Sequence, residues 1–390
     1  MILAILGRQP AISIAELESL VGANNITPIA NNLALINQTN LPFNPNHVGS
    51  VIKFANIIPQ TATRSLPALE KSSIKFIISL YPAQTAGKIK LGFSDYSGTL
   101  SRQELLRLGL SVKKTLKKND YSARVVPNTS PTLGSAQIIH NSLTKQNGAE
   151  LVIFKQNGSL QLAHTIHEQN IEAYAARDQA RPKRDARVGM LPPKLAQTII
   201  NLASGPYQEN QTLLDTFCGT GVILQEALLM GYNVYGTDIE PKMIQYSKDN
   251  LDWLKNKIPN IDGTVTLKQG DATSYNWKPT PDIIASESYL GRPLTQALSP
   301  TDMQSLVNSV NTLHKKIFAH IATQVTSGTR ICLAVPAWHV GGRFMTLPVL
   351  DQLHNLGYNK LEFKHTKPQD LIYARADQIV GRQLVVLQKK

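Results

Sequence analysis

The chain has 390 residues and carries 40 Lys and Arg against 27 Asp and Glu, a formal net charge of +13. Its 2 cysteines exclude a disulfide scaffold and favour a reducing, cytoplasmic setting. Transmembrane and secreted classes are not indicated, because no apolar run approaches ~20 residues and MILAIL at the N-terminus is too short for a signal peptide.

The positive charge is concentrated in the first half of the chain. Residues 1–188 hold 21 Lys and Arg against 11 Asp and Glu, a net of +10, whereas residues 189–390 hold 19 against 16, a net of +3. Because RNA binds largely through Lys and Arg that neutralise phosphates, the asymmetry predicts a nucleic-acid contact in the N-terminal half. The alternative is that the charge only keeps this half soluble.

The first 65 residues are expected to form a small α+β, ferredoxin-like domain. MILAIL is typical of a strand, and Ile12–Val21 of a helix with Ser13 as its N-cap and Glu16 completing a capping box. A second domain is expected over 66–170. There IKFIISLY and IKLGFSDY have strand composition, and Arg102–Lys118 has a helical pattern.

The second domain is expected to end in a hairpin. YSARVVPN is typical of a strand and SAQIIHNSL of a short helix, and the strands AELVIFKQNG and LQLAHTIHEQN meet at Asn157-Gly158. Residues 171–190 then become rich in Arg, Lys and Pro without apolar periodicity. This segment is expected to be a basic linker.

Residues 191–390 alternate helices with apolar strands. TLLDTF, YNVYGTDI, VTLKQGDA, DIIASES and GTRICLAVP have strand character, and a helix is expected from Met243 to Leu254. A helix around Leu350–Leu356 and the strands KLEFKH and QLVVLQ complete the pattern. The alternation predicts an α/β domain with a mainly parallel sheet of about seven strands.

The most specific motif is DTFCGTG, Asp215–Gly221, between a strand and a helix. Gly219 and Gly221 allow a sharp turn and close approach of a ligand. Asp238 ends the next strand, where a carboxylate can bind a ribose diol, and Gly270-Asp271-Ala272 follows the strand after that. The pattern indicates a nucleoside-containing cofactor, although a glycine turn without a ligand is also possible.

The choice of cofactor depends on the residue three positions after Gly221. A nicotinamide-binding loop needs a third glycine there, and this chain has Leu224. S-adenosylmethionine has no pyrophosphate to bind, and Asp215 is suitably placed for its sulfonium and ammonium charges. The sequence therefore favours S-adenosylmethionine over a dinucleotide.

These residues resemble the THUMP-domain RNA methyltransferases, in particular the family that makes N2-methylguanosine and N2,N2-dimethylguanosine in tRNA. DTFCGTGVILQEA is similar to the family motif DPFCGTG-x-x-x-x-EA, with Thr216 in place of proline. ARVGMLPPKLAQTIINLA, RVVPN, GSAQIIHNSL and ILGRQPAISIAELESL are similar to other family segments. The resemblance implies a THUMP RNA-binding domain at 66–170 and a Rossmann-like methyltransferase domain at 191–390.

The resemblance also implies which residues hold S-adenosylmethionine. In the family, the segment upstream of the first motif lies along the cofactor, which adds Met190 and Pro192. The cofactor-binding residues expected in this chain are Asp215, Phe217, Cys218, Gly219, Thr220, Gly221, Asp238, Ile239, Asp271, Ala272, Met190 and Pro192.

The chain departs from the family where the catalytic motif Asp-Pro-Pro-Tyr is expected. Glu287 and Ser288 stand in place of the aspartate and a proline, and Tyr289 supplies the ring, whereas alignment on Gly291 places Leu290 there. The expected catalytic residues are Glu287, Ser288 and Tyr289. Losing proline is expected to loosen the loop, because proline fixes φ. An active variant, a changed target and a degenerate site all fit this motif.

Seven basic residues are expected to contact RNA, with a solvated charged surface as the alternative. They are Lys113, Lys114, Lys117, Arg124, Arg181, Lys183 and Arg184. Arg177 and Arg187 belong to the same linker cluster. Trp338 and His339, before Gly341-Gly342-Arg343, border a substrate pocket or are packed in the core. No histidine or cysteine spacing indicates a metal site.

The sequence thus predicts a cytoplasmic enzyme that methylates the exocyclic N2 amine of a guanosine in tRNA with S-adenosylmethionine. One alternative is an RNA-binding protein whose methyltransferase-like domain is degenerate or serves as a scaffold. Another is a methyltransferase acting on an amine of DNA or protein. The sequence does not identify a protein partner.

Overall fold

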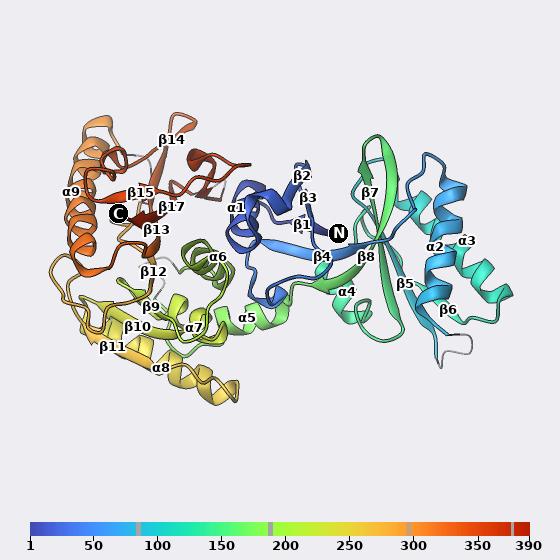
Figure 1. Cartoon of the computed structure of the whole chain (residues 1–390), viewed down its shortest axis with the longest axis horizontal. Coiled ribbons are helices and arrows are strands. Elements are labelled where there is room, and N and C mark those ends of the chain that lie inside the picture. Colours follow the sequence, from blue (N-terminus) through green and yellow to red (C-terminus); the bar gives the residue numbers. More distant parts are fainter. Residues whose placement is uncertain (83–86, 186–189, 295, 297, 376–377) are drawn as a thin grey trace. The chain divides into compact units, whose positions relative to one another are not determined.

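The computed structural model describes residues 1–82, 87–185, 190–294, 296, 298–375 and 378–390, and these form two compact units (Figure 1). The N-terminal unit comprises Met1–Arg8, Asn24–Leu41 and Val51–Glu172. The C-terminal unit comprises Gln9–Ala23, Pro42–Ser50 and Ala173–Lys390. Within the described ranges, none of the helices has both the length and the apolar composition that crossing a bilayer requires.

One eight-stranded sheet runs through the N-terminal unit in the order β2-β3-β1-β4-β8-β7-β5-β6. β4 pairs antiparallel with β8, so the sheet is continuous across residue 65, where two separate domains were predicted. Three helices, α2 (Leu66–Leu80), α3 (Arg102–Lys118) and α4 (Ser135–His140), accompany it. The strands are β1 (Ile2–Leu6), β2 (Ile26–Ala30), β3 (Leu33–Ile36), β4 (Val51–Ile57), β5 (Ile89–Asp95), β6 (Ala123–Val125), β7 (Gly148–Gln156) and β8 (Ser159–Glu168).

The strand predicted at IKFIISLY is wrong, because these residues continue the helix α2. Leu69, Ser73 and Ile77 are buried at intervals of four residues, which is the repeat of a helix face rather than of a strand. The helix predicted over Arg102–Lys118 is confirmed as α3, whose N-terminus carries a capping box between Ser101 and Glu104.

The hairpin predicted at Asn157-Gly158 is confirmed. β7 and β8 pair antiparallel up to Gln156 and Ser159. Asn157 and Gly158 have φ values of +49° and +77°, the left-handed conformation that a two-residue hairpin turn requires at both positions.

A second sheet forms the centre of the C-terminal unit, in the order β11-β10-β9-β12-β13-β17-β15, with β14 and β16 paired at its side. Neighbouring strands from β11 to β13 are parallel, and β17 is antiparallel to β13 and β15. A dinucleotide-binding sheet of order 3-2-1-4-5-6 lacks such an inserted antiparallel strand. The strands are β9 (Thr212–Asp215), β10 (Asn233–Asp238), β11 (Val265–Gln269), β12 (Ile283–Glu287), β13 (Arg330–Val340), β14 (Arg343–Met345), β15 (Tyr358–Lys360), β16 (Ile372–Tyr373) and β17 (Val380–Lys389).

Helices cover both faces of this sheet, as the alternation predicted. α6 (Pro193–Ser204), α7 (Val222–Leu229) and α8 (Pro241–Lys257) share one apolar core with β9 and β10. α9 (Pro300–Gln324) lies in the other core, and the sequence analysis did not predict it. The helix predicted at Leu350–Leu356 is instead a 3-10 turn at Pro348–Asp351. The strand predicted at KLEFKH is wrong except at its first residue, because β15 ends at Lys360.

The helix α1 (Pro10–Val21) belongs to the C-terminal unit, although it lies near the start of the chain. The capping box predicted for it is wrong, since Gln9 is the N-cap and Pro10 begins the helix. The Glu16 carboxylate instead accepts hydrogen bonds from the backbone N–H groups of Gly49 and Ser50, at 3.0 and 2.9 Å. These bonds fix the segment Pro42–Ser50 beside the helix.

Residues 171–190 are only partly the linker that the sequence predicted. α5 (Ile171–Gln179) occupies the first half, and Ala186 to Gly189 lie outside the described residues, so the structure says nothing of Arg187.

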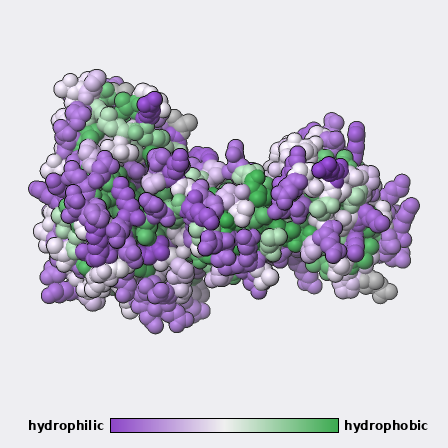
Figure 2. All heavy atoms as spheres, turned by 45° about the horizontal axis from the view of Figure 1, so that its top comes forward, coloured by the Kyte–Doolittle hydropathy of each residue, from purple (hydrophilic) through white to green (hydrophobic). Residues whose placement is uncertain are grey.

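The surface visible in Figure 2 is mainly hydrophilic, with smaller apolar groups between the polar side chains.

Candidate active site

Asp215 lies at the carboxyl end of β9, where the glycine loop begins. Its carboxylate is 2% exposed, and Oδ1 accepts hydrogen bonds from Ser286 Oγ at 2.6 Å and from the Phe217 N–H at 3.2 Å. Burial raises the pKa of Asp215 to about 7, although the Ser286 bond opposes the shift. Asp215 is therefore a buried acid whose ionised form a neighbouring cation would favour.

The two glycines of the loop meet two different requirements. Gly221 has φ +81°, and a Cβ there would lie 2.9 Å from Ser247 Oγ, so α8 leaves no room for a side chain. Gly219 has φ +50°, and its N–H donates to Asp238 Oδ2 at 2.9 Å. The loop between β9 and α7 is thus tied to the end of β10.

Cys218 occupies the centre of this loop as a buried small residue. Its backbone N–H donates to the Thr237 carbonyl at 2.9 Å, and burial raises the pKa of its thiol. A thiol with a raised pKa is a poor nucleophile, so the structure gives Cys218 no chemical role beyond packing.

Further groups lie where β10 and β11 end. Ile239 is 59% exposed, while Asp238 Oδ1 accepts from the Glu240 N–H at 2.9 Å. Asp271 is exposed and accepts from the Thr273 N–H and hydroxyl, both at 2.8 Å, and Ala272 is buried. An exposed apolar side chain beside two carboxylates suits a nucleoside. Its base would pack against Ile239, and its ribose hydroxyls or its base amino group would donate hydrogen bonds to Asp238 and Asp271.

Met190 and Pro192 immediately precede α6, and Pro192 is its N-cap residue. The Met190 sulfur lies 3.5 Å from Arg184 Nε. Of the family-like segment ARVGMLPPK, Ala186 to Gly189 lie outside the described residues. The cofactor role of Met190 and Pro192 therefore stays a prediction.

Glu287 ends β12 and forms an ion pair with Arg382 of β17. Nε of Arg382 donates to Oε1 of Glu287, and the two side chains are 7% and 17% exposed. Burial raises the pKa of Glu287, and the guanidinium opposes that shift. Arg382 thereby favours the ionised carboxylate, whose remaining lone pairs can accept hydrogen bonds from another donor.

Ser288 is held more firmly than its replacement of a proline suggested. It is 4% exposed, its N–H donates to the Ala334 carbonyl at 2.9 Å, and its Oγ lies 2.8 Å from His314 Nε2. Burial lowers the pKa of His314 to about 4, and Nδ1 donates to the Val310 carbonyl at 2.8 Å. The neutral ring therefore offers Nε2 as a hydrogen-bond acceptor to the Ser288 hydroxyl, whose Oγ also lies 3.0 Å from the Ala334 carbonyl oxygen.

Two expectations about Ser288 are corrected by this arrangement. The loop does not depend on proline for rigidity, since hydrogen bonds to Ala334 and His314 fix it. The hydroxyl is directed into the core and not towards a substrate, so Ser288 positions the loop and is not itself a catalytic residue. Tyr289, by contrast, is 47% exposed and is the aromatic ring that this motif presents.

Four of the predicted RNA-binding residues lie exposed in the N-terminal unit. Lys113, Lys114 and Lys117 project from the second half of α3, and Arg124 lies in the short strand β6. Long basic side chains in water can reach phosphates without first breaking a buried contact. These four residues are compatible with the role predicted for them.

The linker residues behave differently from one another. Arg181 is 3% exposed, with Nη2 3.9 Å from Asp178, so the prediction that it contacts RNA is wrong: burial removes it from solvent. Lys183 is partly exposed and lies 3.5 Å from Asp249, whereas Arg184 is exposed. Arg177 pairs with the buried Glu226 at 2.6 Å, which makes it a structural residue.

Three residues that shape the site were not predicted from the sequence: Ser286, His314 and Arg382. Arg382 is a buried charge that precedes the apolar run of β17, and a buried charge signals a partner in the fold. His314 lies on the apolar face of α9 with Val307, Val310 and Ile317, a pattern that reads as core. Within the described residues, no group of His, Cys, Asp and Glu is arranged to hold a metal ion.

Comparisons with known proteins agree with this architecture. Residues 208–337 match the family described as "Methyltransferase domain", and residues 154–249 match the one described as "DNA methylase". The crystal structure of TrmN from Thermus thermophilus superposes with a TM-score of 0.54 at 13% identity, covering 100% of this chain and 99% of that one. This likeness confirms the predicted Rossmann-like methyltransferase fold.

Curated relatives match a shorter segment. The tRNA (guanine(10)-N2)-dimethyltransferase of Methanothermobacter thermautotrophicus is 42% identical over 76 residues, 19% of this chain and 22% of the relative. The enzyme of the same name from Pyrococcus abyssi is 40% identical over 83 residues, 21% of this chain and 22% of the relative. The matches thus span about a fifth of those enzymes. They confirm the resemblance to tRNA guanine-N2 methyltransferases over that segment.

Proposed function

We propose that this chain, related over part of its length to tRNA guanine-N2 methyltransferases, uses S-adenosylmethionine to methylate the exocyclic N2 amine of a guanosine in tRNA. The observation that carries the proposal is the junction of β9 and β12. There Asp215 of the glycine loop and Glu287 of the second motif end neighbouring parallel strands, and Ser286 bonds to the first while preceding the second. The glycine loop after β9, which would bind the cofactor, and the loop after β12, which would bind the target base, are therefore directly connected.

The glycine loop and the ends of β10 and β11 would hold the cofactor. Asp215 would face its cationic methionine end, Asp238 its ribose, and Ile239, Asp271 and Ala272 its base. Phe217, Cys218, Gly219, Thr220 and Gly221 would supply the backbone surface of the loop. When bound, S-adenosylmethionine supplies an electrophilic methyl group on a sulfonium, so that this chain needs to orient the nucleophile and exclude water.

Glu287 would accept a hydrogen bond from the amine that is methylated. The nitrogen lone pair of an aromatic amine is delocalised, and an acceptor on its hydrogen helps to localise it and takes up charge as the bond forms. Arg382 supports this role because its guanidinium favours the ionised carboxylate and opposes the burial that raises the pKa of Glu287. Tyr289 would stack on the base, because its ring is exposed beside Glu287.

The N-terminal unit would bind the tRNA. It carries most of the excess positive charge of the chain, and α3 and β6 display Lys113, Lys114, Lys117 and Arg124 to solvent. Lys183 and Arg184 would add contacts beyond it. We assign 66–170 as a THUMP RNA-binding domain on the family resemblance. Recognition by shape and backbone suits a folded RNA such as tRNA, and a tRNA-modifying role places the protein in the cytoplasm.

A scaffold without catalysis is the competing function, in which the Glu287–Arg382 pair would serve the fold alone. A carboxylate that is satisfied by an arginine within the fold can serve stability alone. The two functions differ in whether the wild type transfers a methyl group and in whether that transfer is lost when Glu287 loses its charge.

The test replaces Glu287→Gln and compares it with Glu209→Gln, an exposed carboxylate elsewhere in the C-terminal unit. Methyl transfer to an unmodified tRNA transcript should fall by roughly 10²–10³ in the first variant, with affinities for S-adenosylmethionine and tRNA unchanged. Glu209→Gln should match the wild type. Equal transfer by both variants would reject the role given to Glu287, and no transfer by the wild type would reject the enzymatic function.

A further inference from the structure

The strand β13 extends beyond the edge of the sheet that carries the candidate active site. Its residue Ala334 pairs with Glu287, where β12 ends, and β13 then continues from Val335 to Val340. Those six residues reach about 20 Å past Glu287 at ~3.3 Å per residue. The strand turns at Gly341-Gly342 and returns as β14, so a hairpin stands above this edge.

The tip of this hairpin carries an aromatic pair on its exposed part. His339 is paired with Phe344 across the two strands, and their ring centroids lie 5.4 Å apart at 65°. Both residues are exposed, and Phe344 retains 37% of its accessible surface. The two rings thus present an aromatic surface that a stacking ligand can reach.

The fold leaves room for the Phe344 ring. Gly381 of β17 has no side chain, and a Cβ there would approach Phe344 Cε1 to 3.3 Å. Gly381 is followed at once by Arg382, the partner of Glu287. The ring therefore lies against the strand that also fixes the carboxylate of the active site, and Trp338, fully buried, anchors the base of the hairpin.

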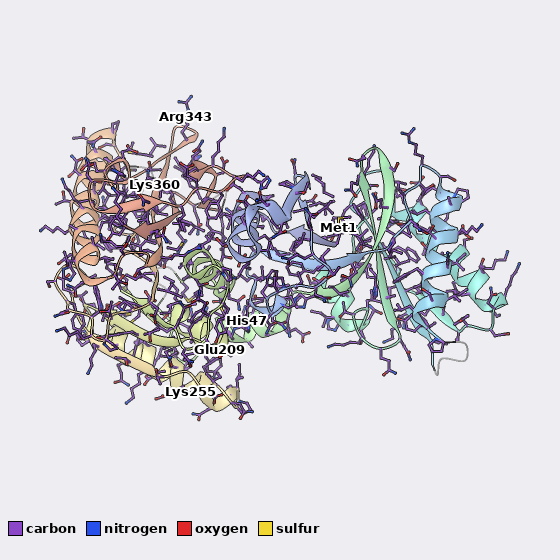
Figure 3. All side chains as sticks on the ribbon, viewed as in Figure 1. Met1, His47, Glu209, Lys255, Arg343 and Lys360 are labelled. Atoms are coloured by element: carbon purple, nitrogen blue, oxygen red, sulfur yellow. The ribbon has the colours of Figure 1, made fainter. Side chains whose placement is uncertain are left out.

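Charge on the hairpin has one sign. From Val335 to Met345 the sequence is VPAWHVGGRFM, which contains Arg343 and no acidic residue. Gly341 and Gly342 have φ values of +56° and +80°, which give the tight turn that places Arg343 at the tip. In Figure 3 its side chain points away from the sheet into solvent.

We propose that this hairpin, residues 339–344, binds unstacked nucleotides of the RNA substrate next to the base that is methylated. A base would stack on the His339–Phe344 pair, and Arg343 would contact the adjoining phosphate. Aromatic rings with a neighbouring cation are the usual means of holding single-stranded nucleotides, and a base must leave its stack before its amine can be reached. The inference rests on the proposed function and adds to it a substrate-binding element of the C-terminal unit.

The test compares Phe344→Leu, which keeps an apolar side chain but removes the ring, with Phe344→Tyr, which keeps the ring. Arg343→Gln is compared with Lys255→Gln, an exposed cation on α8. For an unmodified tRNA transcript, kcat/KM should fall about tenfold in Phe344→Leu and in Arg343→Gln. It should stay near the wild-type value in Phe344→Tyr and Lys255→Gln, and affinity for S-adenosylmethionine should be equal in all five proteins.

A second readout does not require methylation. Ultraviolet cross-linking of the wild type to the same tRNA, followed by mass spectrometry of peptides, should find nucleotides attached within residues 339–344. If the wild type methylates tRNA and neither kcat/KM nor cross-linking involves the hairpin, the inference is wrong while the proposed function stands. If the wild type cross-links through the hairpin but transfers no methyl group, the proposed enzyme fails instead. A change of oligomeric state in Phe344→Leu, without loss of RNA contact, would identify a second copy as the occupant and overturn the inference.

Discussion

The hydroxyl group of Ser286 donates a hydrogen bond of 2.6 Å to Oδ1 of Asp215, joining the end of β12 to the end of β9. Both partners are buried, at 0% and 2% exposure. Because Ser286 immediately precedes Glu287, the group expected to contact the cofactor and the group expected to contact the target base are held by one bond. A substitution at the end of β9 or of β12 should therefore affect both cofactor binding and methyl transfer.

The first prediction concerns the pH dependence of cofactor binding. Burial raises the pKa of Asp215 to about 7, and a cationic ligand favours the ionised form. Affinity for S-adenosylmethionine should be nearly constant above about pH 8 and weaken about tenfold between pH 8 and pH 6 as the carboxyl takes up its proton. Calorimetric titration across this range measures it.

Ser286→Ala provides the matched test of the same shift. The Ser286 bond lowers the pKa of Asp215, so its loss should raise that pKa and move the binding midpoint to higher pH. Ser309→Ala, an exposed serine of α9, should leave the midpoint in place. A midpoint unaffected by Ser286→Ala would show that another group controls the titration.

The second prediction addresses Arg382. The guanidinium lowers the pKa of Glu287, which burial alone raises, so Arg382→Gln should raise that pKa further. Methyl transfer needs the ionised carboxylate, and its loss should therefore be greatest at low pH and partly recovered as pH rises. Arg382→Lys, which keeps the charge but loses the guanidinium geometry, should lie between wild type and Arg382→Gln in a pH profile of kcat. A uniform loss at every pH would assign Arg382 to folding only.

Much of the C-terminal unit was predictable because its signals are local. The glycine loop, the alternation of strands and helices and Asp238 at the end of β10 are patterns within short segments. α9, a helix of 25 residues, was not predicted, although Ser299 as its N-cap and Pro300 as its first residue are local signals for a helix start. IKFIISLY was misassigned as a strand because a short apolar run fits the repeat of a strand and that of a helix equally well. Only the burial of Leu69, Ser73 and Ile77 at intervals of four residues shows that the segment is helical.

The active site was predictable in position and not in its contacts. Glu287 stands where the motif placed a carboxylate, but its partner Arg382 is 95 residues away in sequence, and such pairs follow from strand order. Ser288 was expected to make the loop after β12 less rigid, because a serine does not fix φ as the family's proline does. Its bonds to Ala334 and His314 depend on β13 and α9, which no local pattern brings together.

The third prediction restores the family residue at this position. Ser288→Pro removes the N–H that bonds to Ala334 and the hydroxyl that bonds to His314, both within the core. Leaving the buried His314 ring and a carbonyl without donors should cost about 1–3 kcal/mol of unfolding free energy and should not raise methyl transfer. Ser288→Ala, which keeps the N–H, should lose less. Denaturant unfolding ranks the variants, and a more active or more stable proline variant would contradict the role given to Ser288.

The fourth prediction follows from α1 belonging to the C-terminal unit. The buried Glu16 carboxylate accepts hydrogen bonds from Gly49, Ser50 and Thr198, and from Asn201 Nδ2 at 2.7 Å, so it joins α1 to α6 and the segment Pro42–Ser50.

Glu16→Ala leaves these donors buried without an acceptor, and the unfolding free energy should fall by about 3 kcal/mol, against less than about 0.5 kcal/mol for the exposed control Glu209→Ala. A fragment that starts at Ala173 lacks α1 altogether. It should lose a stable fold, as followed by thermal unfolding monitored by circular dichroism, because Ile12 and Ala15 no longer cover the core formed with Leu195 and Ile199. A fragment that unfolds as cooperatively as the whole chain would show instead that α1 merely rests on a domain complete without it.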